Sequence, residues 1–414
     1  MQNFSRRTVF AAGISTITFG TALAPKPSWA SPSNPSAKFE KDFDTLWKTL
    51  RDQYCFFAEK LTDWNKVRAA YFPMAAQSTT VDNFTEVVRL VLAELYDAHT
   101  HLSQPPVGSP RWPLFDLLVH RRGQSLEIAA IDEGSAAELA GLSIGDKIVE
   151  IGGQKIAETL DRLRPRCLLR PHEEVEDYIS NVAVAGRRGQ ARQFSIMSKD
   201  AKQHTVDLPI HQTVQRPAVE WRKLENGAGY IVIRSFSDNE VVQSFDRALS
   251  ELRDASGLII DVRQNGGGDT AVARPIMGRF ITSRKPYAMM RRRKGAGLGS
   301  PWIEYVEPRG PFTYEGPVVV LTSHWSASMA EGFPMGMRGI GRATVVGTRM
   351  MGLGAAVFTK TLKQTGITFQ FSAEPVYDVQ DRPRWQMEPD IVVHARDDVI
   401  VAAASVLAAK NRLP

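Results

Sequence analysis

The chain has 414 residues, of which 43% are hydrophobic and 23% charged, with a formal net charge of +6. One hydrophobic core rarely grows past ~250–300 residues, so we expect two or three globular domains. The aromatic, glycine and proline contents exclude a collagen-like or broadly disordered chain. The sequence does not decide whether its two cysteines, Cys55 and Cys167, form a disulfide. Because it has no C-x-x-C or H-E-x-x-H spacing, we predict no structural metal and no cofactor.

Residues 1–30 are typical of a signal peptide. A twin arginine, Arg6 and Arg7, precedes an apolar run over 9–24, and small residues before Ala30 suit a cleavage site. The run is shorter than the ~20 residues of a spanning helix. We therefore expect export by the twin-arginine route to a periplasmic or secreted location, with no integral membrane segment after processing.

Removal of this segment lowers the net charge from +6 to +3, because it contains three basic residues and no acidic one. Such a small excess does not favour binding to nucleic acid or to an anionic membrane. The strongest basic run, Arg291–Lys294, is interpreted as a solvated loop or edge strand, with attraction of a substrate carboxylate as the alternative.

Three segments follow in chain order. Residues 31–105 form a predicted helical domain, in which Phe43, Leu46, Trp47 and Leu50 have helical spacing. Residues 106–215 contain "GSAAELAGLSIGDKIVEIGG", which resembles a PDZ domain, a fold that binds peptide ends by strand addition. A closed or unused groove is the alternative. Residues 216–414 form the last predicted domain.

This last segment alternates apolar strands with helices, which indicates an α/β core with partly parallel pairing. Strands are predicted over 229–236, 316–323 and 343–348, and over 257–268, where the strand ends in glycines. A helix is expected to begin at Ser237 with Glu240 in capping-box spacing, and another closes the chain over 397–413.

Two strand ends carry candidate chemistry. "DVRQNGGGD", 261–269, ends in three glycines that can expose backbone N–H groups to an oxyanion. "VLTSHWSASMAEGF", 320–333, would place Ser328 at a strand-to-helix turn, with Glu331 three residues later. An ordinary flexible turn and an ordinary capping serine are the alternatives. Pro334 counts against a smooth helix after this serine.

Together, "RQNGGGD", "VVVLTSHWSASMAEG", "RATVVGTRMMGLGA" and "MEPDIVV" resemble the C-terminal processing (tail-specific) serine peptidases. The resemblance implies a ClpP/crotonase-like core of ββα layers, with an N-terminal helical domain and an inserted PDZ-like domain. It implies Ser328 as nucleophile, Glu331 as the acid that follows it, and Gly266, Gly267 and Met329 as the oxyanion hole.

One position departs from that family's pattern. Leu353 stands where the base lysine is expected, and leucine cannot take a proton. "LYDAHTHL" resembles an element of the tricorn-like branch, which uses a histidine base, and His99 matches that histidine. Imidazole suits this role near neutral pH. His324 and Lys360 are rival bases.

A carboxylate is expected to orient the base. Three acids of 374–390 are candidates: Glu374, Asp378 and Asp381.

The favoured function is an exported serine endopeptidase that cleaves peptides or protein tails through an acyl-enzyme on Ser328. A non-catalytic binding protein on the same scaffold and a hydrolase of another acyl compound are the alternatives. The expected partner is a peptide or protein substrate, and oligomerisation is left open.

Overall fold

The structure of the chain is a computed structural model that describes residues 36–198, 200, 202–212, 215–394 and 398–412. The predicted signal peptide lies outside the described residues. Residues 36–414 form one compact unit.

The N-terminal part is helical, as the apolar spacing predicts. Its helices are α1 (Ala37–Gln53), α2 (Trp64–Ala76) and α3 (Val81–Ala93). Phe39, Phe43, Leu46 and Leu50 of α1 are fully buried, because residues three and four apart share one helix face. The side chain of Asp63 accepts hydrogen bonds from two N–H groups of the first turn and so caps α2.

The PDZ-like part is a small antiparallel sheet with three helices. The sheet order is β2-β3-β4-β6-β7, with β5 paired to β4. The strands are β2 (Leu117–Arg122), β3 (Ser125–Ile131), β4 (Lys147–Ile151), β5 (Gln154–Lys155), β6 (Arg192–Met197) and β7 (Gln203–Leu208). The helices are α4 (Ala136–Leu139), α5 (Ile156–Leu163) and α6 (Glu173–Ala185). Strand β2 is at an edge of the sheet, and α6 packs beside it.

The α/β core is built on a six-stranded sheet with the order β19-β16-β15-β10-β9-β8. The strands are β8 (Val219–Lys223), β9 (Gly229–Ile233), β10 (Leu258–Asp261), β15 (Val318–Thr322), β16 (Ala343–Gly347) and β19 (Ile391–Val392). All pairs are parallel except β8 with β9. The predicted strands form here because their continuous apolar runs are buried on both faces.

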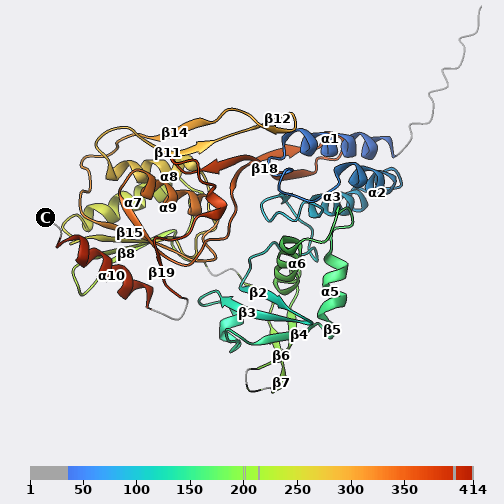
Figure 1. Cartoon of the computed structure of the whole chain (residues 1–414), viewed down its shortest axis with the longest axis horizontal. Coiled ribbons are helices and arrows are strands. Elements are labelled where there is room, and N and C mark those ends of the chain that lie inside the picture. The colour runs from blue at the N-terminus through green and yellow to red at the C-terminus, as the bar shows by residue number, and fades with distance from the viewer. Residues whose placement is uncertain (1–35, 199, 201, 213–214, 395–397, 413–414) are drawn as a thin grey trace, which may run out of the picture. The chain divides into compact units, whose positions relative to one another are not determined.

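Helices cover both faces of this sheet, so the predicted fold class is confirmed (Figure 1). On one face lie α7 (Glu240–Glu251), α8 (Thr270–Met277) and α9 (Met329–Gly339). On the other lies α10 (Val399–Lys410), which the closing apolar segment predicts. A 3-10 turn, η1 (Gly278–Phe280), follows α8.

A second sheet lies beyond α9, which contacts β16 on one side and β11 on the other. Its order is β1-β18-β11-β14, with β17 also paired to β18. The strands are β1 (His101–Leu102), β11 (Lys285–Met290), β14 (Trp302–Val306), β17 (Ala355–Thr361) and β18 (Thr368–Tyr377). Because β1 follows the N-terminal helices, this sheet joins them to the core. The short strands β12 (Arg293–Lys294) and β13 (Gly297–Leu298) form a hairpin, and η2 (Arg384–Gln386) is a second 3-10 turn.

Two local expectations are wrong. Helix α7 begins at Glu240 without a capping box from Ser237, because the side chain of Asp238 accepts the Glu240 N–H instead, at 2.9 Å. Pro334 does not interrupt α9, which continues from Met329 to Gly339.

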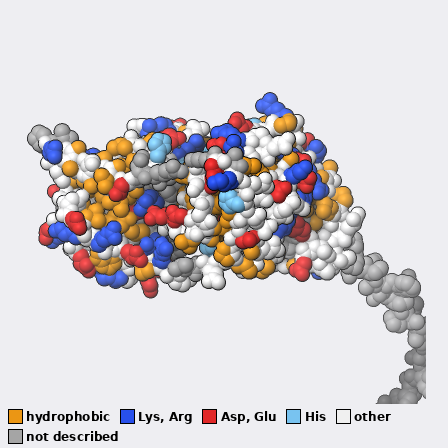
Figure 2. All heavy atoms as spheres, turned by 90° about the horizontal axis from the view of Figure 1, so that it is seen from below, with side chains coloured by type: hydrophobic (Ala, Val, Ile, Leu, Met, Phe, Trp, Pro, Cys, Tyr) orange, Lys and Arg blue, Asp and Glu red, His pale blue; other side chains and the backbone are white. Residues whose placement is uncertain are grey.

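On the face drawn in Figure 2, basic and acidic side chains are interspersed, with hydrophobic side chains between them. Cys55 and Cys167 are buried free thiols. Within the described part of the chain, no helix is long and apolar enough to cross a membrane.

Candidate active site

The turn between β15 and α9 is fixed by its serine side chains. The Ser326 hydroxyl donates to the Val262 carbonyl (2.8 Å) and accepts the Ser323 N–H (3.0 Å). The Ser323 hydroxyl donates to the carbonyl of Arg263 (2.5 Å). These bonds tie the turn after β15 to the turn after β10, so the two candidate strand ends meet.

Ser328 is the residue before the first turn of α9, and its backbone is strained. Its φ is 55° and its ψ −114°, a left-handed conformation that costs a non-glycine residue about 1–3 kcal/mol. The Ser328 N–H donates to the Glu331 carboxylate at 2.8 Å, which helps to hold this conformation. A strained serine between a strand and a helix is the geometry of a nucleophile elbow.

Glu331 is fully buried and accepts three backbone hydrogen bonds. Besides Ser328, the N–H groups of Leu353 (2.7 Å) and Gly352 (3.1 Å) donate to it. Burial raises the pKa of Glu331, while the charge of Arg384 and these three N–H groups oppose the rise. The residue therefore links the serine turn to the segment that carries Leu353.

The glycine run packs directly against the serine. A Cβ placed on Gly267, whose φ is 105°, would lie 2.8 Å from the Ser328 Cβ and 3.0 Å from the Met329 nitrogen. Only glycine allows so close an approach, which brings Gly267, Ser328 and Met329 together. The Met329 N–H lies in the first turn of α9, where N–H groups have no intrahelical partner.

Asn265 holds the glycine run in place, a role that the sequence analysis did not predict. Its fully buried side chain accepts the Gly267 N–H (2.8 Å) and donates to the Ile233 carbonyl (3.0 Å). Its own carbonyl accepts the Ala327 N–H, one residue before the serine. Because the Gly267 N–H is engaged with Asn265, the oxyanion donors left from the predicted set are the N–H groups of Gly266 and Met329.

A cavity of about 400 Å³ opens beside Ser328. Much of its wall is apolar, with Tyr287, Met290, Met335 and Val376 among the lining residues. Such a wall suits an apolar side chain more than a charged one.

His99 lies in the turn between α3 and β1 and is 7% exposed. Its backbone N–H donates to Asp97 (2.9 Å), and its carbonyl accepts from Gln370 of β18 (3.1 Å). Its Nδ1 is buried without a partner, and no hydrogen bond joins it to Ser328 within the described residues. Burial lowers the pKa of His99 to about 4, with Asp97 opposing the fall and Arg384 and His101 adding to it.

The three candidate orienting acids all contact arginines. Arg292 donates to Glu374 (2.7 Å) and Arg291 to Asp381 (2.6 Å), so the basic run is engaged with two of them. Asp378 accepts from Arg382 (2.6 Å) in its own turn. No described hydrogen bond connects any of the three to His99. The acid that accepts the His99 backbone N–H is Asp97. The sequence analysis included Asp97 only within the motif "LYDAHTHL" and did not propose it as the orienting acid.

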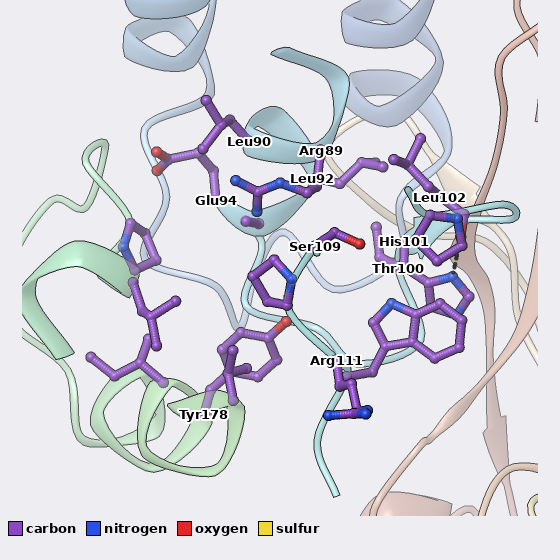
Figure 3. A pocket seen from close by; sticks show the side chains of 18 of the residues that line it. Arg89, Leu90, Leu92, Glu94, Thr100, His101, Leu102, Ser109, Arg111 and Tyr178 are labelled. Atoms are coloured by element: carbon purple, nitrogen blue, oxygen red, sulfur yellow. Dashed lines mark hydrogen bonds between the residues drawn. The ribbon is translucent and has the colours of Figure 1, made fainter. Parts of the chain in front are cut away.

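The rival bases lie elsewhere. Lys360, on β17, lines a different cavity that does not include Ser328. His324 lines the large cleft described below, and burial lowers its pKa. His101 faces a third pocket, where its ring stacks on Trp112 and its Nδ1 contacts the Leu102 carbonyl (Figure 3). Among His99, His101 and His324, the charge of Arg384, which lines the serine cavity, lowers the pKa of His99 alone.

A second candidate site is the edge of the PDZ-like sheet. A cleft of about 600 Å³ runs past β2 and α6 and is also lined by Leu353 and His324 of the core. The side chain of Asn181, on α6, accepts the Val119 N–H (2.9 Å) and donates to the Val119 carbonyl (3.1 Å). Asn181 therefore occupies two of the backbone groups of β2 with which an added peptide strand would pair.

Arg384 is a further residue that the sequence did not single out. It is 5% exposed, lines the cavity beside Ser328, and donates to the carbonyls of Leu353 and Ala355. An arginine within a loop segment gives no sequence signal of burial.

This combination of a ββα core, a strained serine and an adjoining glycine run defines a serine-hydrolase scaffold. Residues 227–393 match peptidase family S41, residues 35–93 match the C1 domain of tricorn protease, and residues 127–175 match a PDZ domain. The chain thus carries an S41 peptidase core, together with a tricorn C1 region and a PDZ domain.

Named relatives agree with this assignment. The chain is 29% identical to the carboxy-terminal processing protease CtpB of Bacillus subtilis over 53% of its own length and 42% of that protein's. It is 23% identical to the tail-specific protease of Haemophilus influenzae over 78% and 47%, respectively. The chain thus spans less than half the length of either relative.

Two solved structures share the fold. Mature CPAF has a TM-score of 0.61 at 14% identity, covering 92% of this chain and 97% of that one. The photosystem II D1 C-terminal processing protease has a TM-score of 0.58 at 16% identity, covering 87% and 94%.

Proposed function

We propose that the chain is a serine peptidase that cleaves peptides or protein tails through an acyl-enzyme on Ser328. The observation that carries the proposal is the strained Ser328 turn with Gly267 packed against it. The Ser328 oxygen attacks the peptide carbonyl, and the N–H groups of Gly266 and Met329 receive the developing oxyanion. The apolar cavity beside Ser328 favours an apolar substrate side chain before the cleaved bond.

His99 is the proposed base. Its depressed pKa keeps the imidazole neutral at pH 7, so it can accept the serine proton and later return it to the leaving amine. The unpartnered Nδ1 would gain a partner when the site closes on substrate, since catalytic hydrogen bonds often tighten only in the complex. The twin-arginine segment supports export, which N-terminal sequencing of the protein recovered from the cell envelope or medium would test.

The decisive experiment is labelling with a fluorophosphonate probe. We expect the wild type to label, Ser328→Ala not to label, and His99→Ala to label at least ~100-fold more slowly. His324→Gln is the matched histidine control and should label like the wild type. A folded wild type that does not label would overturn the proposal.

Two observations favour a second candidate function, a non-catalytic peptide-binding protein. Leu353 replaces the family's lysine, and His99 has no hydrogen bond to Ser328 in this structure. Peptide binding without turnover, unchanged in Ser328→Ala, would select this function over the peptidase.

A further inference from the structure

The segment 352–355 contains the position at which the resemblance expects a lysine, and two buried charged side chains hold its backbone. Glu331 accepts the N–H groups of Gly352 (3.1 Å) and Leu353 (2.7 Å). Arg384 Nη2 donates to the carbonyls of Leu353 and Ala355, the latter at 3.2 Å. The carboxylate thus binds the donors of this turn, and the guanidinium binds its acceptors.

The two charges act on each other through space. No nitrogen–oxygen contact within 4 Å joins them in the described structure, and both groups are at least 95% buried. Burial lowers the pKa of Arg384, while Glu331 and Tyr287 oppose the fall. Glu331 therefore depends on Arg384 to remain ionised, whereas Arg384 stays protonated and without Glu331 would be a buried charge with no compensating one.

This paired attachment lies in the wall between two cavities. Arg384 and Ala355 line the cavity of Ser328, whereas Leu353, Gly354 and Trp385 line the cleft beside the PDZ domain. A Cβ on Gly332 would lie 3.4 Å from Arg384 Nη1, so the guanidinium also lies against the first turns of α9.

We propose that Arg384 is a positioning residue that supplies the buried cation of this site. It anchors the 352–355 turn, keeps Glu331 a carboxylate, and through Glu331 holds the Ser328 N–H. The proposal rests on the proposed peptidase function for its effect on rate. Its structural part concerns the backbone of residues 352–355 alone.

The same cation acts on the proposed base. Arg384 lowers the pKa of His99, which Asp97 opposes and His101 reinforces. It also opposes the rise in the pKa of Glu331. Loss of the cation therefore raises both pKa values, and the acidic limb of the pH–rate profile moves to higher pH.

The test compares Arg384→Met with Arg384→Lys, which keeps the charge. In Arg384→Met we expect the acidic limb of kcat/KM to move up by about one pH unit and the plateau to fall ~10²-fold. Arg384→Lys should restore the limb and most of the plateau. Arg338→Met, a matched control whose arginine pairs with Asp390 at the far end of α9, should leave the limb in place. A limb that stays in place in Arg384→Met, or the same shift in Arg384→Lys, would overturn the proposal.

A second readout does not depend on activity. Hydrogen exchange at the amides of Gly352 and Leu353 should accelerate at least tenfold in Arg384→Met but not in Arg384→Lys, and unchanged protection would overturn the proposal. If Arg384→Met does not fold, the double variant Arg384→Met/Glu331→Gln removes both buried charges and should fold. The 352 and 353 amides should then exchange faster in the double variant than in the wild type, and equal protection would again overturn the proposal. If the wild type does not label with the fluorophosphonate but the variants still show this exchange pattern, the peptidase function is rejected and the role of Arg384 is retained.

Discussion

The buried neutral imidazole of His99 predicts a measurable acid sensitivity of the fold. The pKa of His99 is about 4 in the folded chain, against about 6.5 for an unperturbed histidine. The unfolded state therefore binds more protons between these values, so stability falls as the pH is lowered through this range. Between pH 7.5 and pH 5.0 the linkage relation gives a loss of ~2 kcal/mol for this one side chain.

The perturbation is His99→Gln, and the assay is urea unfolding followed by tryptophan fluorescence at pH 7.5 and 5.0. The wild type should lose ~2 kcal/mol more of its free energy of unfolding between these pH values than the variant does. His204→Gln, which alters an exposed histidine, controls for the substitution itself. Titrating groups that do not interact with His99, such as Asp132, whose pKa burial raises to about 6, act alike in both proteins and cancel. Equal losses in wild type and His99→Gln would refute the reasoning.

Three further predictions follow from individual contacts. Gly267→Ala should lower kcat/KM by ~10²–10³-fold with little effect on substrate affinity, because its Cβ would displace the Ser328 turn and the oxyanion donors; an unchanged rate would show that this contact is not required. Asn181→Ala should tighten binding of a carboxylate-ended peptide to β2, measured by fluorescence anisotropy, while Asn226→Ala should not; weaker binding would mean that Asn181 contacts the ligand. Arg192→Met should destabilise the chain by about 3–5 kcal/mol in urea unfolding, since it leaves the buried Asp116 unpaired, and Arg192→Met/Asp116→Leu should recover most of that loss.

The strands, the helices and the strand-to-helix turn at Ser328 were predictable because their signals are local. An apolar run such as 318–322 predicts a strand buried on both faces even when its partner strands are unknown. The spacing of Phe43, Leu46 and Leu50 likewise defines one helix face. The error at Ser237 is also local, because Asp238 competes for the same N–H group.

The polar contacts that organise the site were not predictable. Each of these side chains forms a hydrogen bond with a backbone group far away in the sequence. The separation is 32 residues for Asn265 and Ile233, 62 for Asn181 and Val119, and 31 for Arg384 and Leu353. Nothing in an isolated asparagine or arginine indicates which backbone group it will bind after folding. The partner of the His99 imidazole is unpredictable for the same reason, since the candidate acids pair with arginines from the connection between β11 and β12 or from their own turn.

The attachment of the 352–355 turn has a consequence for how this site can vary. Both Glu331 and Arg384 bind the main chain of residue 353, and every amino acid except proline offers the same N–H and C=O groups. The side chain at 353 lines the cleft beside the PDZ domain and is not among those around Ser328. A lysine could thus give way to leucine at this position while the serine turn kept its shape. By the same logic, Leu353→Lys would place a new ammonium in the cleft without creating a serine–lysine pair.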